Sequence, residues 1–108
     1  MGDVEERVLG PMGDRVVFEN ERARIWELTI PPGQDSNIHR HDLDYILVQI
    51  DGDRIAGVPE PDSAGEYNEY IEADVTPGNA IFITKGGIEL ARNTGKKEYY
   101  EILIELKE

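Results

Sequence analysis

Short runs of strand-forming residues, each ended by a turn signal, constrain this chain more than any other feature of its sequence. Most of "YILVQI" (45–50) is apolar, and the run ends at Gly52. Such a run predicts a strand that is covered on both faces. Strands are also expected at 22–30, 54–58, 67–75, 80–84, 88–93 and 98–108, with 54–58 returning from 45–50 as an antiparallel hairpin. No stretch shows helical periodicity. The pattern therefore predicts an all-β chain, an antiparallel β-sandwich or barrel.

Length and charge narrow the class of protein. At 108 residues the chain predicts one domain, with 1–14 as an N-terminal extension or arm. The net charge of −12 argues against nucleic acid and anionic membrane surfaces as partners. Cysteine is absent, which excludes disulfides, thiolate nucleophiles and zinc–sulfur sites. The acidic start has no long apolar run, so a cytoplasmic location is expected.

The two histidines of the chain, His39 and His41, are two residues apart. On a strand, alternating side chains project to the same face, so both imidazoles can reach one divalent ion. Two ligands bind weakly, and a third must come from another part of the chain. The alternative is a polar, hydrogen-bonding pair of side chains without a metal.

The segment around the histidines, "PGQDSNIHRHDLDYILVQIDG", resembles the first conserved motif of the cupins. In that motif a glycine, His-x-His, a glutamate and a second glycine follow one another at fixed spacings. Gly33, His39, His41 and Gly52 fit these spacings, whereas Tyr45 stands where the family usually has the glutamate.

A second segment, "GNAIFITKGGIELARN", resembles the second cupin motif. Gly78, Gly86 and Asn93 stand at the family's spacing. Thr84 replaces a proline, and Glu89 replaces the histidine that completes the metal site of the family. The resemblance runs from about residue 18 to 106 and implies a cupin: a jelly-roll barrel, in many members a homodimer, with a divalent metal ion (Fe, Mn, Ni or Zn).

The substitutions leave three ways to complete the site. Glu89 can replace the missing histidine, because it alternates with Ala91 and Asn93 on one face of its strand. His39, His41 and Glu89 would then form the two-histidine, one-carboxylate set that suits non-haem Fe(II), with Tyr45 as a nearby hydroxyl, a proton donor or an additional ligand. Alternatively the metal is lost and the same side chains form a polar cluster. In a third arrangement, Asp44 supplies the carboxylate through a local bulge.

These observations lead to two functions of different classes. The first is a metal-assisted enzyme on a small organic molecule, of dioxygenase, decarboxylase, lyase or isomerase type, with His39, His41 and Glu89 as metal ligands and Tyr45 and Glu89 as catalytic groups. The second is a non-catalytic, metal-free module that binds a small ligand. A homodimer is expected in either case, since one face of 45–50 fills the barrel and the other needs a cover.

Overall fold

Strand-forming segments supply all the regular secondary structure of the described residues. In a computed structural model that describes residues 8–107, there are nine strands and no helix. The strands are β1 (Arg15–Glu19), β2 (Ala23–Ile30), β3 (His39–Arg40), β4 (Tyr45–Asp51), β5 (Arg54–Pro59), β6 (Ile71–Asp74), β7 (Ala80–Ile83), β8 (Ile88–Asn93) and β9 (Tyr99–Leu106). The part of the chain described thus contains no helix that could cross a membrane.

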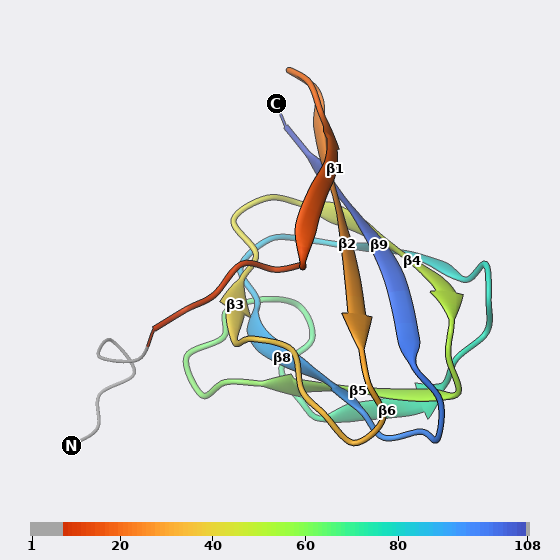
Figure 1. Ribbon diagram of the computed structural model, residues 1–108. Coiled ribbons are helices and arrows are strands. Elements are labelled where there is room, and N and C mark those ends of the chain that lie inside the picture. The colour runs from red at the N-terminus through yellow and green to blue at the C-terminus, as the bar shows by residue number, and fades with distance from the viewer. Residues whose placement is uncertain (1–7, 108) are drawn as a thin grey trace.

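The strands form two antiparallel sheets. One has the order β1-β2-β9-β4-β7, and the other has the order β3-β8-β5-β6. From β2 onward the chain passes repeatedly from one sheet to the other, and Figure 1 shows β2, β9 and β4 in one layer with β8, β5 and β6 in the other. This is the predicted all-β jelly-roll architecture. β1 lies outside the strands that the sequence predicts.

The predicted hairpin between 45–50 and 54–58 is wrong. β4 pairs with β9 and β7, whereas β5 pairs with β6 and β8 in the other sheet. Gly52 marks the corner between the sheets. Its φ of +148° favours glycine, and a Cβ there would lie 2.8 Å from the ring of Tyr99. The glycine therefore allows the chain to cross closely over β9.

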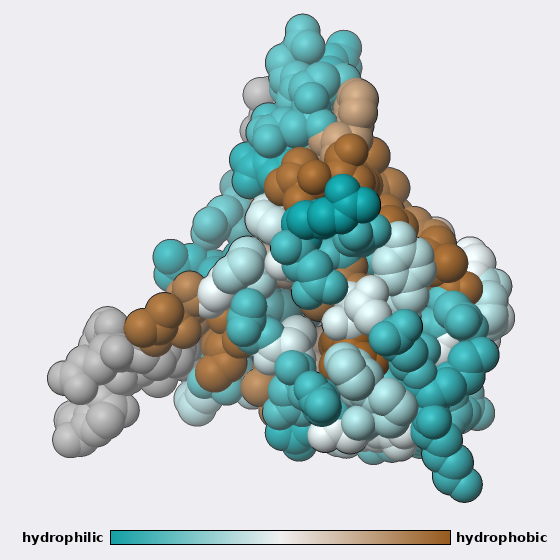
Figure 2. Space-filling model, viewed as in Figure 1, coloured by the Kyte–Doolittle hydropathy of each residue, from teal (hydrophilic) through white to brown (hydrophobic). Residues whose placement is uncertain are grey.

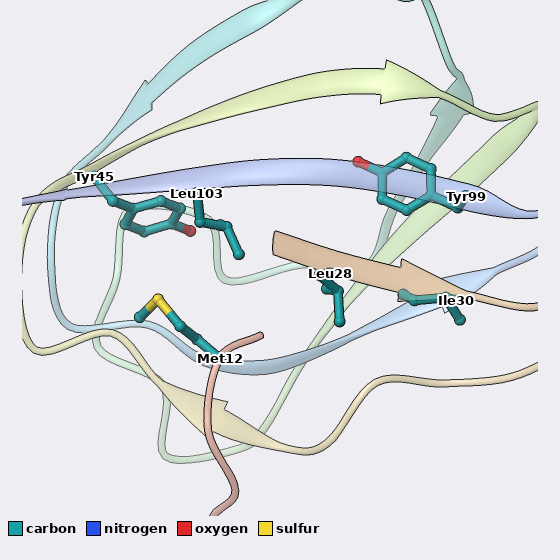
Figure 3. Packing of buried hydrophobic residues seen from close by; sticks show 6 residues of the cluster. All are labelled: Met12, Leu28, Ile30, Tyr45, Tyr99 and Leu103. Carbon is teal, nitrogen blue, oxygen red and sulfur yellow. The ribbon is translucent and has the colours of Figure 1, made fainter. Parts of the chain in front are cut away.

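The core lies between the two sheets and includes a residue from the segment before β1. Figure 3 shows its buried cluster, which consists of Met12, Leu28, Ile30, Tyr45, Tyr99 and Leu103. Residues 1–7 of the predicted extension lie outside the described part of the chain. Its later part packs on the barrel, because Met12 is buried and the Gly10 N–H donates to the Ile38 carbonyl oxygen at 2.8 Å.

The two faces of β9 differ in an unexpected way. The strand predicted at 98–108 is present and its burial alternates, but the interior face carries two buried glutamates, Glu101 and Glu105. The outer face carries apolar residues instead, among them Ile102 and Ile104. In Figure 2, hydrophobic residues gather on the side of the molecule where Figure 1 places β1, β2, β9 and β4.

The loop 59–66, which its composition marks as the most disorder-prone segment, is held against the barrel. The Ala64 N–H donates to the Gly86 carbonyl oxygen at 2.9 Å, and the Ser63 hydroxyl accepts from the Ile88 N–H at 3.0 Å. A Cβ on Gly65 would lie 2.8 Å from the nitrogen of Gly87. This packing places the loop beside the start of β8, next to the site described below.

Candidate metal centre and its cavity

The two histidines are placed by the pairing of β3 with β8. His39 stands directly opposite Glu89 in this pair. Backbone hydrogen bonds continue beyond the short β3, since the His41 N–H donates to Gly87 and the His41 carbonyl oxygen accepts from Gly86, each at 2.9 Å. Both imidazoles are buried, and their ring centroids lie 4.7 Å apart. The predicted common direction of His39 and His41 is therefore present.

Glu89 faces the same space as the histidines. Its Oε2 lies 3.4 Å from Nε2 of His41, without the alignment of a hydrogen bond. The nitrogen and oxygen atoms that could bind a metal on His39, His41 and Glu89 all lie within 4.8 Å of one another. Two ligands bound at about 2.1 Å to one ion lie at most about 4.2 Å apart, so small side-chain adjustments would suffice.

The hydrogen bonds of the histidines leave nitrogen atoms free on the side of the site. Nδ1 of His39 lies 2.8 Å from the carbonyl oxygen of Asn37. In a neutral imidazole this contact places the proton on Nδ1 and leaves Nε2 as a lone-pair donor. Both ring nitrogens of His41 are buried and lack a hydrogen-bond partner within residues 8–107. A buried polar atom without a partner is costly, and a bound cation would remove that cost at one of the two nitrogens. The donor set thus fits a divalent metal.

Burial sets the protonation states of the site. It lowers the pKa of His39 to about 4, assisted by the neighbouring His41, so this imidazole is neutral at pH 7. Burial by itself would raise the pKa of Glu89, but His41 and then His39 outweigh it and lower the pKa overall. A neutral imidazole and an ionised carboxylate are the forms that bind metal.

Tyr45 lies against the histidines. Its ring stacks on His41, with centroids 4.0 Å apart and planes inclined by 12°. Burial raises its pKa, and the charges of Glu89 and Glu101 raise it further. The phenol therefore keeps its proton at neutral pH and can act as a hydrogen-bond donor.

Asp44 does not join the site. Its carboxylate accepts a hydrogen bond from the Lys85 N–H at 2.8 Å, and it is not part of the group formed by His39, His41 and Glu89. The third arrangement that the sequence allows is therefore absent.

The three side chains line one end of a cavity of about 260 Å³ between the sheets. Apolar side chains form much of its wall, including Leu47, Ile81 and Leu103. Tyr67 and Ile71 line it as well and are exposed, so the cavity reaches solvent near β6.

A second polar group lines the cavity, and sequence reasoning missed it. Its members are Gln49, Tyr99 and Glu101. The Tyr99 hydroxyl donates to Oε1 of Glu101 at 2.6 Å. The only sequence signal was that alternation places Glu101 on the same strand face as Tyr99, and alternation does not say which face is interior.

Comparisons with known proteins identify the fold. A cupin-domain protein from Bordetella pertussis Tohama I superposes with a TM-score of 0.73 at 24% identity, over 87% of this chain and 91% of that chain. A cupin family protein from Methanocaldococcus jannaschii with a double-stranded β-helix fold gives 0.68 at 15% identity, over 97% and 94%. A double-stranded β-helix protein from Klebsiella pneumoniae gives 0.65 at 18%, over 98% and 88%.

No protein-family model and no curated protein matches the sequence. The structural likenesses agree with the two facing antiparallel sheets. The chain therefore has the fold of a small cupin.

Proposed function

We propose that the protein is a metal-dependent enzyme that acts on a small organic molecule inside the barrel. His39, His41 and Glu89 hold a divalent metal ion. The observation that carries this proposal is the pair of buried, unbonded ring nitrogens on His41 beside the carboxylate of Glu89. Two imidazoles and one carboxylate suit Fe(II), with Mn, Ni and Zn as competitors.

The side chains around the metal site would bind and orient the ligand and hold its protons. A bound metal of this kind supplies Lewis-acid chemistry and, for iron, redox chemistry at open coordination positions. The carbonyl of Asn37 orients His39, and the carboxylate of Glu89 would offset part of the positive charge of the bound metal ion. Tyr45 holds a phenolic proton at the edge of the site and serves as a hydrogen-bond or proton donor to the ligand. The apolar wall limits water around the reacting groups.

Metal content tests the proposal directly. Protein purified without an affinity tag is examined by elemental analysis, together with His39→Ala and Glu89→Gln. Asp42→Asn is the matched control, because its carboxylate stands next to His41 in sequence but is exposed. We expect about one metal per chain in the wild type and the control, and at least a tenfold loss in the other two. Absence of metal after soaking with Fe(II), Mn(II), Ni(II) and Zn(II) would contradict the proposal.

The contact between His41 and Glu89 also favours a second candidate, a metal-free binding module. At 3.4 Å the two side chains can stabilise each other electrostatically without an ion. In that case small carboxylates or sugars should raise the melting temperature of EDTA-treated protein with no turnover. Stabilisation that depends on added metal would instead support the enzyme.

A further inference from the structure

The cavity has a second polar end, formed by Gln49, Tyr99 and Glu101. Gln49 and Glu101 stand directly opposite each other on β4 and β9. Tyr45, next to the histidines, and Gln49 are four residues apart on β4, which is about 13 Å along a strand. In Figure 3 the hydroxyls of Tyr45 and Tyr99 point toward one another from opposite ends of the core. A ligand in the cavity can therefore meet both polar ends.

The hydrogen bonds at this end have a fixed direction. Oε1 of Gln49 accepts long hydrogen bonds from the Thr76 N–H at 3.4 Å and from Nδ2 of Asn79 at 3.5 Å. Nε2 of Gln49 then points to the Tyr99 hydroxyl oxygen at 3.5 Å. The Tyr99 proton is consequently directed to Oε1 of Glu101.

The hydrogen bond from Tyr99 occupies one oxygen of Glu101, Oε1. The side chain is only 4% exposed and lines the cavity, so a ligand in the cavity can reach the carboxylate. A buried carboxylate needs partners for both oxygens. Burial, the larger effect, and the charge of Glu89 raise the pKa of Glu101 to about 7, even though the Tyr99 hydrogen bond lowers it.

No lysine or arginine is among the described residues that line the cavity. The ionisable groups of the lining are histidines, tyrosines and carboxylates. A carboxylate on the ligand would therefore be repelled by ionised Glu101 at this end of the cavity. A hydrogen-bond donor on the ligand would instead be accepted by the carboxylate of Glu101.

We propose that Glu101 anchors the substrate by accepting a hydrogen bond from an ammonium or hydroxyl group at the end remote from His39 and His41. The substrate is then a short amphipathic molecule with an amine or alcohol at that end and no carboxylate there. This inference rests on the proposed function, because it assigns the substrate class of the same cavity.

Four six-carbon ligands test the anchor by isothermal titration calorimetry at pH 8.5, where Glu101, with its pKa of about 7, is mostly ionised. 6-Aminohexanoate, 6-hydroxyhexanoate, hexanoate and adipate share one carboxylate end and differ only at the other end. The amine and the alcohol should each bind the wild type at least about tenfold more tightly than adipate, a difference of about 1.4 kcal/mol. A stronger amine identifies an ammonium ligand, and a stronger alcohol identifies a hydroxyl ligand.

The variant Glu101→Gln keeps the shape and the acceptor for Tyr99 but replaces Oε2 with a donor. It should bind 6-aminohexanoate more weakly and adipate more tightly than the wild type does. Glu105→Gln is the matched control: Glu105 lies on the same face of β9 with the same 4% exposure, but it binds Trp26 and does not line the cavity. The control should keep the wild-type ranking.

Equal affinity for the four ligands overturns the anchor, as does an unchanged ranking in Glu101→Gln or no binding of 6-aminohexanoate at millimolar concentration. Metal content is measured on the same samples. Wild-type protein that holds metal but shows no ranking refutes the anchor alone, whereas the expected ranking without metal refutes the metal-dependent function alone.

Discussion

Glu101 is a buried carboxylate whose protonation depends on folding, and this has a measurable effect on stability. Its pKa rises from 4.5 to about 7 in the folded chain, chiefly because burial disfavours the charge. Between these values the folded protein keeps a proton that the unfolded chain releases. The free energy of unfolding should therefore fall as pH rises through this window, by up to about 3 kcal/mol from this group.

Urea unfolding of metal-free wild type and Glu101→Gln between pH 4.5 and 8 measures that contribution. Other ionisable groups act on both proteins alike, so the difference between the two curves isolates Glu101. Relative to the wild type, the variant should gain stability steadily toward high pH. Parallel curves would show that the carboxyl titrates normally in the folded state.

Tyr45 occupies the place of a metal-binding glutamate in the cupin motif, yet its raised pKa keeps it a neutral phenol. A neutral phenol is a poor ligand, whereas its ring stacks on His41 and supports the site by packing. Tyr45→Phe keeps that ring, so it should bind metal as the wild type does. Elemental analysis gives the result, and a loss of metal comparable to that of His39→Ala would make Tyr45 a ligand.

At the scale of elements, the turn that leads into β8 positions His41. Gly86 has a φ of +112°, and a Cβ there would lie 3.0 Å from the carbonyl oxygen of Ala64. Gly86→Ala should therefore cost roughly 1–3 kcal/mol and weaken metal binding, since the Gly86 N–H bonds to His41.

Gly57→Ala is the control for this substitution. A Cβ at Gly57 would meet no atom within 4 Å, and alanine suits a strand interior better than glycine. Its stability should be unchanged or higher in the same urea experiment. Equal effects of the two substitutions would show that neither strain nor the contact with Ala64 matters at Gly86.

The same elements show what sequence patterns can and cannot predict. The His-x-His spacing sufficed to give His39 and His41 a common direction, because alternation on a strand fixes direction locally, whereas Glu89 was one of three alternatives for completing the site. Pairing partners are not local: β4 looked like half of a hairpin, but its neighbours β7 and β9 come much later in the chain. The anchor at Glu101 was missed for a related reason, since alternation separates two faces without stating which one is interior.

At the scale of the whole molecule, no segment within residues 8–107 covers the outer face of the larger sheet. One row of directly opposed residues crosses all five strands and is entirely apolar. The row is Phe18, Ile25, Ile104, Ile46 and Phe82. Its end members, Phe18 and Phe82, are more than half exposed. An apolar stripe of this length is unusual on a monomer surface.

We propose that a second copy of the chain covers this row. With an isoleucine on each side of Ile104 and a phenylalanine at each end, the row matches itself under a two-fold axis through Ile104, as an isologous dimer requires. Each chain carries a net charge of −12, so salt should strengthen the association by screening the repulsion between copies.

Light scattering coupled to size-exclusion chromatography measures the state of the protein at low and high salt. We expect a dimer in the wild type and a folded monomer in Phe82→Glu, because the new carboxylate would be buried without a partner in the interface. Val8→Glu is the control, since Val8 is 90% exposed and lies outside the row, and it should remain dimeric. If the wild type is monomeric at every salt concentration, a second copy of the chain does not cover the row, and the proposal is contradicted.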